Sequence, residues 1–172
     1  MVGAMVDAAL LDFLAGTPFF GGIERTALAT VAAMLAERPV AAGAVVFEEG
    51  EQGCSLFVIR TGTLVVYHRA PPGEPMVKLT RLLPGDFFGE MTLIEMQPRS
   101  ATVRAEGPAV LLELRAADLY RLYKQDLKAY VLVLQNVNRE LCRRLRRTNQ
   151  RLVEWASTAG DESTQVGLPR VH

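Results

Sequence analysis

The sequence predicts a mainly β fold with flanking α-helices: a β-roll or jelly-roll barrel preceded by N-terminal helices and followed by a long C-terminal helix. Three observations support this. Helical apolar spacing opens the chain, short apolar runs between turn residues fill its middle, and one long helical pattern follows. Short strands at such spacing are typical of barrels and jelly rolls. With 172 residues, 49% of them hydrophobic, the chain is long enough for one domain with a substantial core.

Two helices are expected before the strands, over residues 7–16 and 23–37. Leu10, Leu11 and Leu14 share one apolar face of the first helix. Turn residues between the two patterns, from Thr17 to Gly22, separate the helices. The second helix has an apolar face made of Ile23, Ala27, Leu28, Val31, Met34 and Leu35. Residues 1–8 are predicted to be an N-terminal tail, and residues 9–156 the domain itself.

Six apolar runs of strand length occupy the middle of the chain. They cover residues 45–47, 56–59, 63–67, 76–79, 102–103 and 110–114. Residues that favour turns bound each run, among them Gly43, Gly50, Gly62 and the Pro84-Gly85 pair. This regular alternation of strand and turn predicts the β-roll.

Composition excludes several classes of protein. Nineteen basic and 19 acidic residues give a net charge of zero, which predicts no general attraction to nucleic acid or membranes. Two cysteines, Cys54 and Cys142, do not suggest a disulfide framework. No apolar run reaches the roughly 20 residues of a membrane span, and no secretory signal opens the chain. We therefore expect a cytoplasmic protein that holds no metal.

The segment from Phe88 to Val103 is the most informative part of the sequence. A Gly89-Glu90 pair that opens a helical turn leaves free backbone N–H groups for an anion. Arg99 follows close by, and its planar guanidinium can clamp the same anion. Glu90 cannot bind an anion because like charges repel, but its carboxylate suits a sugar hydroxyl. Phosphate and ribose in one site indicate a nucleotide.

This segment closely resembles the phosphate-binding cassette of the cyclic nucleotide-binding domain family. The matching residues are Phe88, Gly89, Glu90, Met91, Thr92, Leu93, Arg99, Ser100 and Ala101. Thr92 stands where an alanine is commoner in the family, and the gap at residues 95–97 lacks the glycine often found there. The resemblance extends from Leu10 to about Trp155, which is nearly the whole chain.

The resemblance implies a cyclic nucleotide ligand, with cAMP favoured over cGMP and a cyclic dinucleotide left open. Arg99 would clamp the phosphate, and Glu90 would accept a hydrogen bond from the ribose 2′-OH. The rest of the phosphate turn would consist of Gly89, Met91, Thr92, Ser100 and Ala101. Three apolar strand residues, Val66, Leu79 and Leu82, would cover the purine, although core packing requires the same residue types.

Residues 126–156 form a second informative segment, a helix of about 45 Å. Its apolar residues recur in steps of four and three, which is a heptad pattern. Asn138 falls at an a position, where a single Asn commonly fixes a two-stranded register. The pattern predicts a parallel homodimer with the interface Leu127, Val131, Leu134, Asn138, Leu141, Leu145 and Leu152. The alternative is that this stripe packs only on its own domain.

By the same resemblance, this helix would also contact the ligand. Thr148 would meet the adenine amino group, and Asn149 would meet the base held by the facing subunit. Arg144 would approach the phosphate or Glu90. Ligand binding would then reorient the helix and signal to a downstream partner protein that the sequence does not identify.

Three alternative functions compete with nucleotide sensing. A transcription regulator would need a DNA-binding domain, and residues 157–172 read as a flexible tail too short for one; unless the chain is truncated, no direct DNA binding is expected. An enzyme of the cupin type needs several His ligands, and the chain has only His68 and His172. A degenerate domain that acts as a dimeric scaffold is the third alternative.

Overall fold

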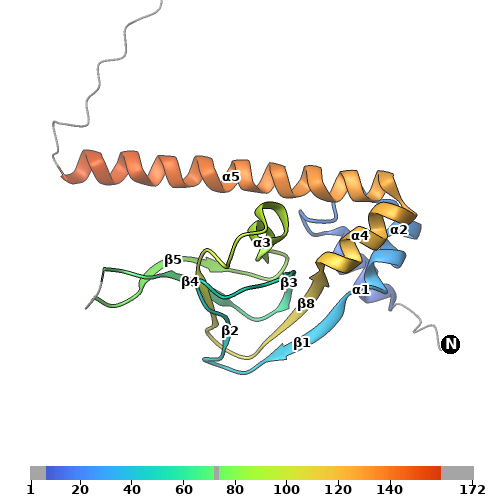
Figure 1. The fold of residues 1–172 in the computed structure, drawn as a ribbon, viewed down its shortest axis with the longest axis horizontal. Helices are drawn as coiled ribbons and strands as arrows, with labels where there is room; N and C mark the ends of the chain where they lie inside the picture. The colour runs from blue at the N-terminus through green and yellow to red at the C-terminus, as the bar shows by residue number, and fades with distance from the viewer. Residues whose placement is uncertain (1–6, 72–73, 160–172) are drawn as a thin grey trace, which may run out of the picture. The chain divides into compact units, whose positions relative to one another are not determined.

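The computed structural model describes residues 7–71 and 74–159. The chain divides into two compact units, Met1–Val137 and Asn138–His172, and each is described by itself. The boundary falls within the last helix, α5 (Figure 1). Both sheets and all other helices of the described chain belong to the first unit.

Helix α1, Ala8–Ala15, begins where expected because Asp7 caps it: Asp7 Oδ1 accepts a hydrogen bond from Ala9 N at 3.1 Å. Helix α2 is shorter than predicted and covers only Arg25–Ala32. The prediction of a helix to residue 37 is wrong, because a short turn ends the helix and strand β1, Ala36–Val40, follows it. This strand contains Pro39, which the fold tolerates since β1 lies at the edge of its sheet.

Two four-stranded antiparallel sheets form the body of the first unit (Figure 1). The first has the order β1-β8-β3-β6, with β8 Ala109–Arg115, β3 Ser55–Thr61 and β6 Phe87–Phe88 added to β1. The second has the order β2-β7-β4-β5, made of β2 Val45–Phe47, β7 Thr102–Ala105, β4 Leu64–His68 and β5 Val77–Leu82. The predicted β-rich, jelly-roll-like architecture is confirmed. Strand β5 runs further than expected, and β6 was not predicted because two residues show no alternation.

The core of the unit draws on both sheets. Its aromatic centre is formed by Phe47, Phe57 and Phe88, and the Phe57 and Phe88 rings stack with centroids 5.3 Å apart. The remaining members are Val40, Val46, Ile59, Leu64, Leu82, Val103, Ala105, Ala109 and Leu111. Dense packing of this kind resists deformation. The core therefore gives the cassette a rigid base.

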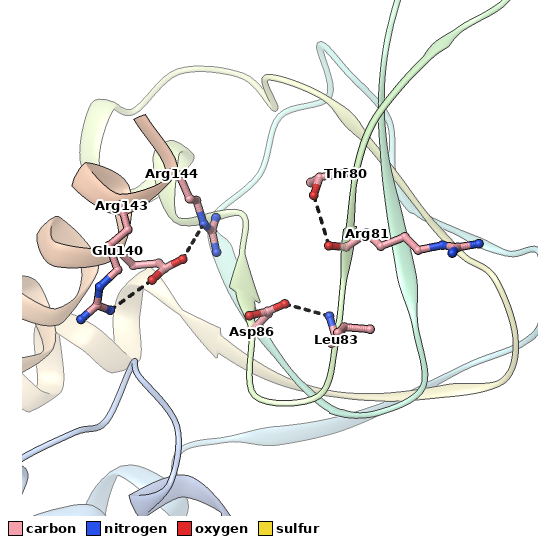
Figure 2. Close-up of polar contacts among 7 residues, drawn as sticks. All are labelled: Thr80, Arg81, Leu83, Asp86, Glu140, Arg143 and Arg144. Carbon is pink, nitrogen blue, oxygen red and sulfur yellow. Dashed lines mark hydrogen bonds and ion pairs between the residues drawn. The ribbon is translucent and has the colours of Figure 1, made fainter. Parts of the chain in front are cut away.

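The cassette helix α3, Glu90–Glu95, forms as the Gly-Glu pair predicts. Gly89 caps its N-terminus with φ +80, a backbone conformation that glycine adopts without strain. The turn before it, over residues 83–86, is closed by a hydrogen bond from Leu83 N to Asp86 Oδ2 at 2.8 Å (Figure 2). This turn joins β5 to β6 and so fixes where α3 begins.

Met96 ends α3 in the left-handed conformation, with φ 55, and it is the one non-glycine residue with positive φ in the described part of the chain. Its side chain is 88% exposed, so few packing contacts depend on it. An L-residue in this conformation costs about 1 kcal/mol. We expect Met96→Gly to raise the free energy of unfolding by about 1 kcal/mol in urea titrations. Met96→Ala retains the Cβ atom and should change stability by less than about 0.5 kcal/mol; equal effects of the two substitutions would contradict the strain argument.

Two helices close the described chain, α4 Ala116–Gln125 and α5 Leu127–Ala159. Within the first unit, the start of α5 is anchored by buried Asn136, whose Nδ2 donates to Phe19 O at 3.1 Å and to Gly21 O at 2.9 Å. The helix continues three residues beyond the expected end at residue 156. The remainder of the predicted tail, residues 160–172, and most of the predicted N-terminal tail lie outside the described residues. No helix in the described ranges is long and apolar enough to cross a membrane.

Candidate functional site

Arg99 is the centre of the candidate site, and it lies inside the first unit with only 6% of its surface exposed. Its Nη1 donates hydrogen bonds to Ser55 O at 2.8 Å and to Gly89 O at 3.0 Å, and it lies 3.5 Å from Thr92 Oγ1. The guanidinium carbon is 4.1 Å from the centroid of the Phe47 ring, a cation–π distance. Strand β3, the cassette and strand β2 thus hold one side chain in place.

Two glycines make room for this guanidinium. A Cβ atom on Gly53 would lie 2.5 Å from Arg99 Nε, and one on Gly89 would lie 2.6 Å from Arg99 Nη1. Both distances are shorter than any real carbon–nitrogen contact between side chains. Gly89 was predicted from the cassette pattern, but Gly53 was missed because its sequence neighbourhood shows only a loop before a strand.

The backbone of Arg99 is paired with the loop that follows β2. Arg99 N donates to Glu51 O at 2.8 Å, and Gly50 N donates to Arg99 O at 2.8 Å. The loop is tied to β7 as well, because Glu49 N donates to Thr102 Oγ1 at 3.0 Å. These bonds bring residues 49–51 to a segment almost 50 positions later in the chain, which sequence patterns did not reveal.

Charged groups around Arg99 partly offset the effect of burial on its pKa. Burial lowers the pKa of the Arg99 guanidinium, while Glu51, Cys54, Glu113 and Glu90 act in the opposite direction. Glu113 is connected to the site through Ser55, whose Oγ donates to Glu113 Oε1 at 2.5 Å. Ser55 therefore links a carboxylate of β8 to the guanidinium through its own hydroxyl and carbonyl.

One donor of Arg99 is left without a partner. Its Nε is buried and has no hydrogen-bond partner among the described residues. A buried unpaired donor on a charged group is costly, so such groups ordinarily meet a partner. A phosphate oxygen is a suitable acceptor for this N–H, because guanidinium and phosphate match in charge and geometry. The residues present thus fit an anionic ligand.

The structure brings the other cassette residues close to Arg99. Glu90 and Thr92 are both buried, with Glu90 only 4% exposed in the first turn of α3. Ser100 is exposed, and its Oγ lies 3.4 Å from Met91 Sδ. Ala101 is half-buried immediately before β7. A carboxylate, hydroxyls and backbone N–H groups are therefore available within a few residues of the guanidinium.

The three apolar residues predicted to cover a purine differ in their surroundings. Leu82 belongs to the core cluster, and Val66 packs against it. Leu79 is 46% exposed and lies at an irregularity of the β4–β5 pairing, where Val66 opposes Thr80 but Tyr67 opposes Lys78. Such a bulge redirects a side chain and is common beside binding sites. Leu79 is thus the most exposed of the three.

The predicted base contacts Arg144, Thr148 and Asn149 belong to the second unit. Within that unit, Arg144 Nε donates to Glu140 Oε1 at 3.3 Å, and Arg143 Nη1 donates to Glu140 Oε2 at 3.3 Å (Figure 2). Thr148 and Asn149 are exposed on α5. Their hydroxyl and amide groups can accept or donate hydrogen bonds.

An open pocket of about 400 Å³ lies elsewhere in the first unit, on the second sheet. It is lined by Val45, Glu48, Tyr67, Arg69, Met76, Thr102 and Arg104. Thr102 and Arg104 alternate along β7 with Val103 and Ala105, which face the core. The pocket is therefore on the outer face of the sheet, and neither Arg99 nor α3 contributes to its lining.

Comparison with known proteins gives three similarities. The family profile described as "Cyclic nucleotide-binding domain" matches residues 37–126. A CRP-like cAMP-activated global transcriptional regulator of Mycobacterium tuberculosis is 34% identical over 149 residues, which are 86% of this chain and 63% of that protein. A cyclic nucleotide-gated potassium channel of Rhizobium etli is 40% identical over 107 residues, which are 62% of this chain and 28% of that protein.

The fold is also similar to a solved structure, that of the Thermus thermophilus catabolite activator protein. The TM-score is 0.70 at 28% sequence identity, with 81% of this chain and 63% of that chain covered. The chain thus spans less than two thirds of the length of the regulator, of the channel and of this structure. The whole cassette, residues 88–103, falls in the matched region, residues 37–126.

Proposed function

Since this chain belongs to the cyclic nucleotide-binding domain family, we propose that it is a cyclic nucleotide sensor whose ligand is cAMP. The observation that supports this most directly is the buried Arg99, held between two glycines with its Nε unpartnered in the described structure. A cyclic phosphodiester is a singly charged anion that this donor fits.

Four residues have separate roles in this proposal: Arg99, Glu90, Leu79 and Ser100. Arg99 binds the phosphate, assisted by the backbone N–H groups at the start of α3. Glu90 accepts a hydrogen bond from the ribose 2′-OH, which discriminates against deoxynucleotides. Leu79, with its exposed side chain, covers one face of the purine. Ser100 supplies a hydroxyl at the rim of the site.

The preference for cAMP over cGMP rests on two considerations. The mycobacterial relative is described as cAMP-activated. In addition, Thr148 and Asn149 have side chains suited to the adenine edge, because both can accept a hydrogen bond from an exocyclic amino group. A syn guanine in contact with Ser100 is the competing arrangement.

We further propose that α5 is a homodimer helix whose position reports ligand binding. Leu127, Val131, Leu145 and Leu152 are exposed along it, as an unpaired heptad interface would be. A nucleotide can shift the helix only if it binds two states unequally, which contacts at Thr148 would provide. Sedimentation velocity with and without nucleotide tests this: a chain that stays monomeric at tens of micromolar with saturating cAMP would contradict the dimer.

Calorimetric titration of the purified chain with cAMP, cGMP and cyclic di-GMP tests the proposed ligand. We expect cAMP to bind most tightly and to raise the melting temperature, because a ligand that binds only the folded state stabilises it. If cGMP or cyclic di-GMP binds more tightly than cAMP, that nucleotide and not cAMP is the ligand. No binding by folded protein would favour a dimeric scaffold.

A further inference from the structure

Several carboxyl groups lie around the phosphate-binding arginine. The groups that act electrostatically on Arg99 include three carboxyl groups, those of Glu51, Glu113 and Glu90. One guanidinium is therefore opposed by several negative charges before any ligand arrives.

Glu51 is fixed in place by the same loop that pairs with Arg99. Its carbonyl accepts the Arg99 N–H at 2.8 Å, and its carboxylate Oε2 accepts a hydrogen bond from Glu48 N at 3.0 Å. The neighbouring Glu49 is engaged in a different direction, since its Oε2 accepts from Arg69 N at 2.8 Å. Glu51 is thus the loop carboxylate whose backbone is bonded directly to the phosphate-binding residue.

We propose that Glu51 is a charge-selecting residue, which lets the site accept a singly charged phosphodiester and disfavour a doubly charged phosphate monoester such as 5′-AMP. This inference rests on the proposed function, and it adds a basis for rejecting the abundant linear nucleotides. Arg99 alone attracts a dianion more strongly than a monoanion. A nearby carboxylate repels each added negative charge and so reverses part of that preference.

Charge and ring shape can be separated with a suitable set of ligands. Cyclic AMP and the methyl ester of 5′-AMP both have one negative charge, whereas 5′-AMP has between one and a half and two at neutral pH, by the ordinary second pKa of a phosphate ester of about 6. The methyl ester has an open chain like 5′-AMP. Comparing 5′-AMP with its methyl ester therefore isolates the effect of the second charge.

The experiment is a competition titration at pH 7.5, in which the three ligands displace a fluorescent cAMP analogue from the wild-type chain and from Glu51→Gln. We expect the ratio of the dissociation constants of 5′-AMP and its methyl ester to fall roughly threefold to tenfold in Glu51→Gln, by the size of one solvent-screened Coulomb interaction. Glu24→Gln is the matched control. Its carboxylate pairs with Lys128 Nζ at 2.6 Å and is not among the groups acting on Arg99.

The outcomes are distinct. If the ratio of the dissociation constants of 5′-AMP and its methyl ester is lower in Glu51→Gln and unchanged in Glu24→Gln, the result supports charge selection by Glu51. An unchanged ratio in a variant that still binds cAMP overturns this inference alone. If wild-type protein does not bind cAMP at all, the proposed function fails, and this inference fails with it.

Discussion

Arg99→Ala is expected to weaken cAMP binding about 100-fold, as measured by calorimetric titration. A hydrogen bond to a charged group contributes about 1.5–3 kcal/mol, and the guanidinium can offer the phosphate more than one. Since each 1.4 kcal/mol is a factor of ten, the loss of this clamp corresponds to about two orders of magnitude. Binding of equal strength in the variant would remove Arg99 from the site.

The structure requires a control for folding in this experiment. Alanine leaves Ser55 O and Gly89 O without the donor that they have now, and it empties a buried space beside Phe47. Thermal unfolding of each variant should therefore be recorded alongside the titration. Arg99→Lys retains the charge but loses the planar fork, and we expect it to bind cAMP about tenfold more weakly than wild type.

Gly53→Ala is expected to reduce cAMP affinity nearly as much as Arg99→Ala, while the fold is retained. The added Cβ atom would lie 2.5 Å from Arg99 Nε and 2.6 Å from the guanidinium carbon. The guanidinium is the end of a long side chain and can move, but it then loses its hydrogen bonds to Ser55 O and Gly89 O, so thermal unfolding of this variant should be recorded as well. Once it has moved, however, it no longer occupies the position between the two glycines from which it would bind a phosphate.

Gly107→Ala is the matched control for this substitution. No atom lies within 4 Å of a Cβ atom built on Gly107, and neither glycine has a positive φ. Alanine is therefore compatible with the backbone at both positions. We expect Gly107→Ala to bind cAMP like wild type and Gly53→Ala to lose about 100-fold, by the same clamp energy. Similar affinities for the two variants would show that the close approach of Gly53 to Arg99 is unimportant.

Local sequence was sufficient to predict the cassette. Gly89, Glu90 and Arg99 are separated by few residues, and each has a physical reason for its type: a positive φ, a carboxylate in the first helical turn and a planar cation. The long helix was also predictable, because its apolar residues repeat along one continuous segment. These features depend on contacts between residues that are near one another in the chain.

The surroundings of Arg99 depend on tertiary structure. Phe47, Gly53 and Ser55 reach the guanidinium from strands and a loop more than 40 positions away, and only strand pairing brings them there. Tertiary structure also decides the start of strand β1, which overlaps the end of the helix predicted over residues 23–37. Its pairing with β8 outweighs the short run of helical apolar spacing there.

The sequence by itself thus determined which residues could bind a phosphate and a ribose, because that chemistry depends on residue types at short spacing. Tertiary structure decided how Arg99 is held, which glycines must remain small and which carboxylates lie near its charge. Those properties arise from distances between segments far apart in the chain, and no local pattern of residues encodes such distances.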